Sequence, residues 1–409
     1  METGKTAAVQ RAGPDVVEGL APHPARRRSP ASEPRTAVSR LLDRFRARVD
    51  VPFAVHLWNG ASYKVGEGGA AFRITVNNSD GLSALKSLNE IEICESYMAG
   101  DLDLEGDMLK LYDLRRLLRK RNPLLDAWRR LKPFFFGQQR EDRKAILEHY
   151  EYDDDFYLSF LDETRTYSQG VFEDDGESLA TATRRKLDFA IESCGLKPGM
   201  RVLDVGGGWG AFTEYAGRRG INVTSLTISD HSFRFLTELI EKEDLPCRAL
   251  MDNFLDHRSD EPYDGIVILG VIEHMPDYPK VVRQLERLLK PGRRAYLDGS
   301  ADRRRYVHNT FMNRYIYPGN HCMLSIHDFL AAVQQSGLEL LTVLNDRHSY
   351  YLTMRGWSEN LDAKREQIVR RWGEVLYRKF HLYLWGVTHN FLTNQQQAYR
   401  LVLQNNPPR

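Results

Sequence analysis

Four glycines follow a short apolar run in the stretch RVLDVGGGWGAF, residues 201–212. The run 202–205 predicts a buried strand, and Asp204 lies within it. The glycines come at once afterwards, at Gly206, Gly207, Gly208 and Gly210, and the next residues, AFTEYAGRR, predict a helix. Glycine lets the backbone approach a ligand closely, and a helix N-terminus presents unpaired N–H groups. The stretch therefore predicts a turn that holds a nucleotide.

Polar residues follow the next predicted strands in order. Thr227, Ser229 and Asp230 end the stretch INVTSLTISD, where a carboxylate can accept hydrogen bonds from ribose hydroxyls. Asp252 and Asn253 follow the third strand, at the place for an adenine edge, and the fourth strand ends in Glu273-His274. Each acid taken alone could instead cap a helix or be a solvated carboxylate in a loop. As an ordered set without a second nucleotide-binding half, they favour S-adenosylmethionine over a dinucleotide, although Gly206, Gly208 and Ala211 satisfy the dinucleotide fingerprint.

The elements that position these residues alternate between strands and helices from about residue 140 onward. This alternation predicts a doubly wound parallel sheet with ligands at the carboxyl ends of its strands. The fold class expected for residues 141–409 is therefore α/β, a Rossmann-like class I methyltransferase sheet with helical insertions. Residues 46–114 alternate apolar and polar residues around Asn-Gly and Gly-Gly turns and then read as helical. They predict a small N-terminal α+β domain.

Composition and charge set wider limits. Hydrophobic residues make up 42% of the 409 residues and the net charge is +1, which is typical of a globular protein and indicates no class of partner. Residues 1–45 are rich in Ala, Pro, Arg and Ser and predict a disordered tail. The four cysteines are scattered, so neither a metal site nor a disulfide is expected. No run is apolar enough to span a bilayer, and the N-terminus lacks a signal-peptide core.

A basic segment, residues 115–136, follows the small domain inside the predicted linker 115–140. It contains eight Lys and Arg residues against the single acid Asp126, interleaved with Leu, Trp128 and three phenylalanines. This pattern favours an interfacial segment lying on anionic lipid. A solvated linker and an RNA-binding segment are the alternatives, and charge alone does not separate them.

In order and spacing, the chain resembles the cyclopropane-fatty-acyl-phospholipid synthases in several segments. The resemblance is carried by LEHYEYDDDFYLSFLDETRTYSQGVF, GVIEHMPDY, FMNRYIYPGN, HSYYLTMRGW and RKFHLYLWGVTHNFLTNQQQAYRLVL, and by VPFAVHLWNG and ESYMAGDLDLEGDM in the small domain. It implies S-adenosylmethionine as the methyl donor and the cis double bond of a phospholipid acyl chain as the acceptor. Tyr167 and Ser168 match the Tyr-Ser that borders the cofactor's methionine end in this family. In such a reaction, aromatic rings can stabilise the cation that methyl transfer leaves on the acyl chain. The candidates are Phe156, Tyr157, Tyr315, Tyr317 and Tyr350, and the alternative is that they pack in the core.

The resemblance also implies a bicarbonate site, and here the chain departs from the family. The family holds the anion with Cys, Glu, His, an Ile backbone group and Tyr. Glu273 and Tyr350 match, whereas Gln169, Asp298 and Ser300 stand at the Cys, His and Ile positions. An Asp beside a Glu would repel an anion, so bicarbonate is not expected as a cofactor.

Two neighbouring carboxylates can instead share a proton, which raises the pKa of one and makes it a base near neutral pH. We expect Glu273 as the base or its orienting partner, Asp298 as the second carboxylate and Tyr350 as a hydrogen-bond donor, with Gln169 completing the site. The alternative is that Asp298 turns away to cap a neighbouring helix.

These observations predict a methyltransferase that acts on unsaturated phospholipid acyl chains and gives methyl- or methylene-branched products. A true cyclopropane synthase and a catalytically silent lipid-binding relative are the alternatives. The expected location is the cytoplasm, at the inner face of the membrane, with residues 115–136 on the anionic surface. A reductase and a second copy of the chain are the protein partners left open, and nucleic acid is not expected.

Overall fold

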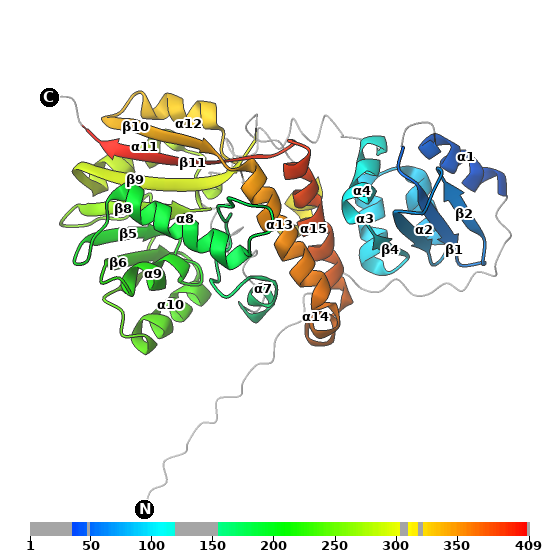
Figure 1. The fold of residues 1–409 in the computed structure, drawn as a ribbon, viewed down its shortest axis with the longest axis horizontal. Helices are drawn as coiled ribbons and strands as arrows, with labels where there is room; N and C mark the ends of the chain where they lie inside the picture. Colours follow the sequence, from blue (N-terminus) through cyan, green and yellow to red (C-terminus); the bar gives the residue numbers. More distant parts are fainter. Residues whose placement is uncertain (1–34, 47–49, 119–153, 303–309, 318–321, 407–409) are drawn as a thin grey trace, which may run out of the picture. The chain divides into compact units, whose positions relative to one another are not determined.

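The computed structural model describes residues 35–46, 50–118, 154–302, 310–317 and 322–406 (Figure 1). Residues 1–44 and 45–409 form separate units. Where the sequence predicted a disordered tail to residue 45, Arg35–Arg46 form helix α1. Its buried side chains, Val38, Leu41, Leu42 and Phe45, recur every three or four residues. That spacing is the mark of an amphipathic helix, and the Pro- and Arg-rich residues before it obscured the pattern.

The small domain contains a four-stranded sheet in the order β2-β1-β3-β4. Its strands are β1 (Phe53–Leu57), β2 (Ser62–Val65), β3 (Phe72–Val76) and β4 (Leu102–Gly106). Its helices are α2 (Ser79–Ser87), α3 (Glu90–Ala99), α4 (Met108–Tyr112) and the 3-10 turn η1 (Asp113–Leu117). Gly60, with φ of 83°, makes the Asn-Gly turn between the antiparallel strands β1 and β2. This is the α+β domain that the sequence predicted.

The large domain is built on a seven-stranded sheet in the order β10-β11-β9-β8-β5-β6-β7. The strands are β5 (Arg201–Val205), β6 (Asn222–Thr227), β7 (Arg248–Met251), β8 (Tyr263–Leu269), β9 (Leu289–Ala301), β10 (Leu338–Asn345) and β11 (Gln397–Asn405). The five strands from β9 to β7 pair in parallel, while β10 and β11 are antiparallel to their neighbours. The order reverses at β5, so β5 and β8 form the switch point where ligands bind in such sheets.

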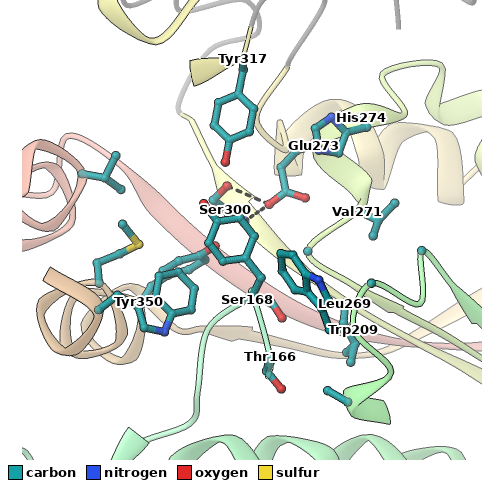
Figure 2. Close-up of a pocket in the computed structure, with 18 of the residues that line it drawn as sticks. Thr166, Ser168, Trp209, Leu269, Val271, Glu273, His274, Ser300, Tyr317 and Tyr350 are labelled. Carbon is teal, nitrogen blue, oxygen red and sulfur yellow. Dashed lines mark hydrogen bonds between the residues drawn. The ribbon is translucent and has the colours of Figure 1, made fainter. Parts of the chain in front are cut away.

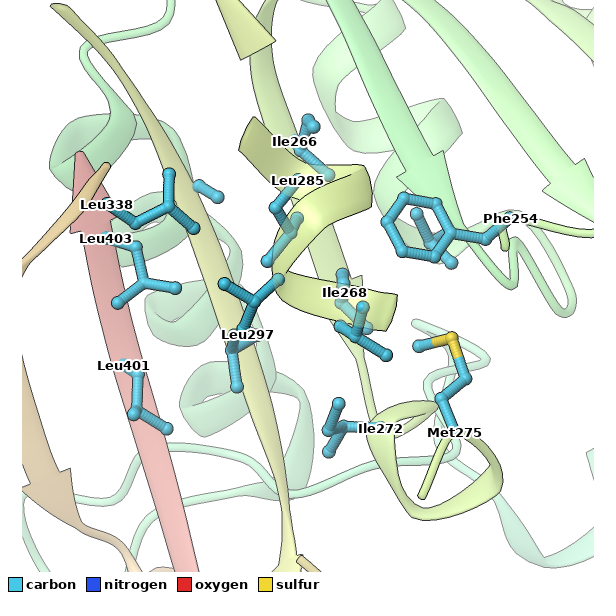
Figure 3. Packing of buried hydrophobic residues seen from close by; sticks show 14 of the residues in the cluster. Phe254, Ile266, Ile268, Ile272, Met275, Leu285, Leu297, Leu338, Leu401 and Leu403 are labelled. Atoms are coloured by element: carbon cyan, nitrogen blue, oxygen red, sulfur yellow. The ribbon is translucent and has the colours of Figure 1, made fainter. Parts of the chain in front are cut away.

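Helices cover both faces of this sheet. The main ones are α8 (Leu179–Cys194), α9 (Ala211–Gly217), α10 (Asp230–Lys242), α11 (Tyr278–Leu288) and α12 (Ile326–Val333). Along β5, Leu203 packs with α11 and α12, as Figure 3 shows for neighbours such as Ile268 and Leu285. Val202 packs on the opposite face with α8 and α9. Because successive side chains of a strand point to opposite faces, apolar residues at the neighbouring positions 202 and 203 are consistent with this double burial.

Four helices lie outside the regular alternation. They are α7 (Asp154–Phe160), α13 (Arg347–Ala363), α14 (Arg365–Trp372) and α15 (Glu374–Leu392). Helices α13 and α15 run side by side next to the end of the sheet (Figure 1). They are the helical insertions that the sequence predicted. In the part of the chain that the structure describes, no helix is long and apolar enough to cross a membrane.

Candidate active site

The glycine turn joins β5 to α9 at the switch point of the sheet. Gly206, Gly208 and Gly210 have φ of 78°, 50° and 73°, a left-handed backbone that favours glycine. A Cβ added at Gly207 would lie 1.9 Å from Ser225 Oγ, so packing as well as backbone geometry requires glycine there. The turn is anchored because the amides of Gly206 and Gly207 both donate to Leu226 O at 2.9 Å.

Asp204 lies beneath this turn. Its Oδ2 accepts hydrogen bonds from Thr213 Oγ1 at 3.0 Å and from Ser225 Oγ at 2.9 Å. Burial raises the pKa of Asp204 to about 6, while the two hydroxyl donors lower it. Because these donors tie β5 to β6 and α9, the carboxylate braces the turn as well as lining the pocket above it.

A pocket opens at the glycine turn and brings distant parts of the chain together. Eight of the residues predicted for the site line it: Tyr167, Ser168, Asp204, Gly206, Gly207, Gly208, Glu273 and Tyr350. Figure 2 shows Glu273 and Ser300 in the middle of the view, with Tyr317 on one side and Ser168 on the other. The pocket is thus polar at the glycine turn. Elsewhere it is lined by aromatic and apolar side chains that include Met312, Tyr317, Met323, Met354, Tyr383, Val387 and Phe391.

Glu273 is the central carboxylate of the pocket. It belongs to the 3-10 turn η2 (Ile272–His274) just after β8. Its Oε1 accepts two hydrogen bonds from Ser300, from the backbone N at 2.7 Å and from Oγ at 2.8 Å. Its Oε2 is buried and has no hydrogen-bond partner among the described residues. Burial raises the pKa of Glu273 to about 7, so one free oxygen can take up a proton near neutral pH.

Two further titratable residues line the pocket near Glu273. The Tyr350 ring stacks on Phe391 with centroids 4.4 Å apart. Burial raises the pKa of Tyr350 well above its usual range, so its phenol keeps its proton at neutral pH. Burial lowers the pKa of His274 to about 4, so this imidazole is neutral there. At neutral pH, Glu273 is therefore the one of these three groups that can change its charge.

Gln169 and Asp298 do not line this pocket, so the predicted pairing of two carboxylates within it does not occur. Asp298 is fully buried, and its carboxylate accepts from the Gly270 amide at 2.9 Å and from Tyr296 hydroxyl at 3.0 Å. Gln169 is also fully buried, and its Nε2 donates to Asp346 at 3.4 Å. The alternative left open by the sequence was that Asp298 turns away to cap a neighbouring helix. Asp298 does turn away, but its partners are a loop amide and a tyrosine hydroxyl. The raised pKa of Glu273 comes mainly from burial, and the Asp298 charge adds least.

The residues predicted for the ribose and adenine follow β6 and β7 but lie outside the pocket lining. Thr227 Oγ1 accepts from the Ser229 amide at 3.1 Å, and Ser229 caps α10, whose first residue is Asp230. Asp252 contacts His257, with 2.7 Å between Oδ2 and Nδ1. Asn253 closes a turn by accepting from the Leu255 amide. Gly210 likewise lies outside the lining, as the first residue before α9. All six lie at or beyond the carboxyl ends of the parallel strands β5, β6 and β7, the edge expected to hold the rest of a nucleotide.

The predicted aromatic faces divide into two groups. Tyr317 and Tyr350 line the pocket. Phe156 and Tyr157 are fully buried in a cluster around Phe380, and Tyr315 donates to Glu95 at 2.6 Å. For these three, structural packing explains the residue type.

Sequence reasoning identified Tyr350 on the long helices but not the pocket residues that accompany it. Tyr350 lines the pocket from α13 together with Met354 and Trp357, and Tyr383, Val387 and Phe391 line it from α15. Both sets recur at three- and four-residue intervals, so each helix presents one face to the pocket. Periodicity could have revealed these faces, but it could not have distinguished a pocket from the core.

Comparisons with known proteins agree with this geometry. The family model described as mycolic acid cyclopropane synthetase matches residues 137–401, and a domain family of unknown function matches residues 41–121. A probable fatty acid methyltransferase of Mycobacterium tuberculosis is 26% identical, with 92% of this chain and 96% of that protein covered. The cyclopropane-fatty-acyl-phospholipid synthase of Escherichia coli is 29% identical, with 82% of this chain and 88% of that protein covered.

Solved structures show the same relationship. A mycolic acid cyclopropane synthase complexed with SAH (S-adenosylhomocysteine) matches with a TM-score of 0.59 and 28% identity. That match covers 64% of this chain and 98% of the other. The glycine turn at the switch point and the acid inside β5 fit an adenosyl cofactor in this chain as well. The chain therefore belongs to the mycolic acid cyclopropane synthetase family and is an S-adenosylmethionine-dependent methyltransferase.

Proposed function

We propose that the protein methylates the cis double bond of an unsaturated phospholipid acyl chain and gives a methyl- or methylene-branched chain. The observation that carries this proposal is Glu273, which lines a pocket with a glycine turn and an aromatic and apolar lining and whose buried Oε2 has no hydrogen-bond partner among the described residues. The relatives named for fatty acid methylation and for cyclopropane-fatty-acyl-phospholipid synthesis support a lipid acceptor.

The lining of the pocket would position the substrate and stabilise the charge that forms on it. Bound S-adenosylmethionine supplies an electrophilic methyl group. The aromatic and apolar lining excludes water and holds the weakly nucleophilic double bond in line with that group. As the alkene electrons form the new carbon–carbon bond, the methyl–sulfur bond would break, S-adenosylhomocysteine would be the leaving group, and a positive charge would remain on the acyl chain. The faces of Tyr317, Tyr350 and Tyr383 can stabilise that cation.

The proton that Glu273 removes decides the product. If it comes from the new methyl group while the cation is on the neighbouring carbon, a cyclopropane ring closes. If it comes from the carbon that bears the methyl group, a methyl-branched alkene forms. If a hydride first shifts so that this carbon carries the cation, loss of a proton from the methyl group gives a methylene branch. A separate reductase can saturate either alkene. We propose the branched outcome because Gln169 and Asp298 are engaged outside the pocket. Glu273 Oε2 then serves as the base in place of a bound bicarbonate.

The direct test incubates the purified protein with S-adenosylmethionine and vesicles of monounsaturated phospholipid, with bicarbonate either depleted or added. We expect a mass increase of one methylene unit and equal rates in both buffers. The proton NMR spectrum should show either an olefinic signal with a branch-methyl signal or the two protons of a methylene branch. Cyclopropane ring protons together with bicarbonate-dependent turnover would overturn the branching proposal. Binding of S-adenosylmethionine with no lipid product would show a catalytically silent relative.

We also propose that residues 115–136 place the enzyme on the anionic inner face of the membrane. Residues 119–136 lie outside the described residues. Of those described, Arg115 is bound within the fold, to Glu90 at 2.8 Å and to Asn390 at 3.1 Å. Arg116 is exposed. The structure therefore favours Arg116 over Arg115 as a lipid contact.

Replacing Arg116, Arg119 and Arg121 with Ser is expected to weaken binding to anionic vesicles by about tenfold or more, since each cation near the surface contributes ~1 kcal/mol. The remaining binding should depend less on salt. Vesicle sedimentation at two salt concentrations measures both effects. The matched control replaces Lys197, Arg258 and Arg370, three exposed cations of the large domain, with Ser. Equal losses in the two triple variants would mean that net charge matters and the segment does not.

A further inference from the structure

A lysine lies fully buried behind the pocket. Lys186, in the middle of α8, has no exposed surface, and its Nζ donates to Ser168 Oγ at 2.6 Å. The same Nζ is 3.9 Å from Asp298 Oδ2, whose side chain is equally buried. Lysine is almost never fully buried unless it is paired, because removing an ammonium from water costs several kcal/mol. This position therefore calls for an explanation beyond packing.

The contact with Ser168 fixes the direction of a hydrogen bond. An ammonium carries three donors and no acceptor, so Ser168 Oγ must accept from Lys186. The hydroxyl hydrogen of Ser168 then remains for another acceptor, and among the described residues Ser168 Oγ makes no hydrogen bond besides the one from Lys186. Ser168 lines the pocket beside the glycine turn (Figure 2). Lys186 thereby leaves the Ser168 hydroxyl as a hydrogen-bond donor in the pocket wall.

Asp298 supports the same part of the pocket wall through Gly270. It accepts from the Gly270 amide at 2.9 Å, and Gly270 lines the pocket directly against Ser168. A Cβ added at Gly270 would lie 2.8 Å from Ser168 Cβ, and Gly270 has φ of 64°. Ser168 is therefore held between Lys186 and the end of β8. The ion pair links α8, β8 and β9 at one point of the pocket wall.

Acids in the buried layer partly offset the cost of burying the Lys186 ammonium. Burial lowers the pKa of Lys186, while the carboxylates of Asp298, Asp346 and Asp162 raise it. Arg400 lies 3.2 Å from Asp346 and offsets its charge. The layer thus pairs two cations with the acids Asp298 and Asp346, which explains why an Asp at position 298 is tolerated away from solvent.

We propose that Lys186 is a positioning residue that orients the Ser168 hydroxyl toward the α-carboxylate of bound S-adenosylmethionine. The cofactor carries one carboxylate, at its amino-acid end, and a carboxylate is the strongest acceptor it can offer to a neutral hydroxyl. The inference rests on the cofactor assignment and is independent of which lipid is methylated.

The test compares two ligands that differ only at that end, S-adenosylhomocysteine and 5′-methylthioadenosine, which lacks the amino-acid part. Calorimetry is run on the full chain, on Ser168→Ala, and on Lys186→Met combined with Asp298→Asn. The double variant removes both charges, because Lys186→Met alone would leave a buried carboxylate without its cation. We expect Ser168→Ala to weaken S-adenosylhomocysteine by about tenfold or more, as for a hydrogen bond to a charged group. The double variant should show most of that loss, and 5′-methylthioadenosine should change by less than about twofold in both.

The matched control is Thr183→Val, a near-isosteric change at a buried residue one turn earlier on α8 and outside the pocket lining. It should leave both affinities unchanged.

Adding Ser168→Ala to the double variant should cause little further loss, because all three residues act through one hydrogen bond. Equal weakening of both ligands, or an unchanged affinity for S-adenosylhomocysteine in the double variant, would overturn the proposal. Failure to methylate lipid would refute the proposed function alone, since no lipid is present in these titrations.

Discussion

Glu273→Gln is expected to lower turnover by about 10²- to 10⁴-fold, the usual contribution of a general base. The substitution keeps the shape of the side chain, and the amide oxygen can still accept from the Ser300 amide and hydroxyl, which now bind Oε1 at 2.7 and 2.8 Å. What disappears is the free Oε2, the only oxygen of Glu273 that has no hydrogen-bond partner among the described residues. Affinity for S-adenosylhomocysteine should therefore stay close to that of the parent while the rate falls.

The pH dependence provides an independent check on the same base. Because burial raises the pKa of Glu273 to about 7, kcat/KM should rise with pH through that value as the carboxylate loses its proton. His274, with a pKa lowered to about 4, and Tyr350, with a pKa raised well above its usual range, do not titrate there. The hydrogen bonds from Ser300 lower the pKa of Glu273. Ser300→Ala should therefore shift the rising limb to higher pH.

The same shift has a consequence for stability. The folded-state pKa of Glu273 lies above its unfolded value, so its contribution to stability is fully present below about pH 4.5 and is lost as pH rises through about 7. Glu273→Gln should remove this contribution to the pH dependence, which chemical denaturation at several pH values can measure. A Glu273→Gln protein with parental turnover, or a parent with a flat pH profile near 7, would assign the base to another group.

Gly208→Val should weaken S-adenosylmethionine binding by about two orders of magnitude, a loss of ~2.7 kcal/mol. Gly208 lines the pocket, and a Cβ there would have only Gly206 O within 4 Å, at 3.8 Å. The new side chain would thus occupy ligand space without striking the protein. Gly207 is the poorer choice, because its Cβ would lie 1.9 Å from Ser225 Oγ and would disturb the fold itself.

Gly199→Val is the matched control for this prediction. Gly199 has φ of 83°, a Cβ there would meet nothing within 4 Å, and it lies outside the pocket lining, in the turn before β5. Both variants bear the cost of a left-handed backbone for a branched residue, about 1–2 kcal/mol, so their melting temperatures should fall by similar amounts. Calorimetry should then separate them, with cofactor affinity lost in Gly208→Val alone. Equal affinities in the two variants would place the cofactor away from the glycine turn.

Local sequence patterns by themselves predicted much of the fold and part of the site. The glycine turn could be predicted because left-handed backbone and close approach each select glycine within a few residues. The parallel sheet followed from the alternation of strands and helices, and Glu273 from its place just beyond a strand end, where parallel strands gather their functional groups. The run 202–205, with Asp204 within it, likewise predicted a buried strand.

Local patterns could not predict which residues of a strand lie near enough to its end to reach the pocket. Tyr296, Asp298 and Ser300 alternate along β9, so their side chains point to the same face, about 7 Å apart from one to the next. Ser300, near the end of the strand, reaches the pocket, whereas Asp298, two residues deeper, meets Tyr296, Gly270 and Lys186 in the buried layer. The sequence identified which residues differ from the family at this site. Only the packing of α8 against β8 and β9 decided that Asp298 contacts a buried lysine, while Glu273 lines the pocket with an Oε2 that has no hydrogen-bond partner among the described residues.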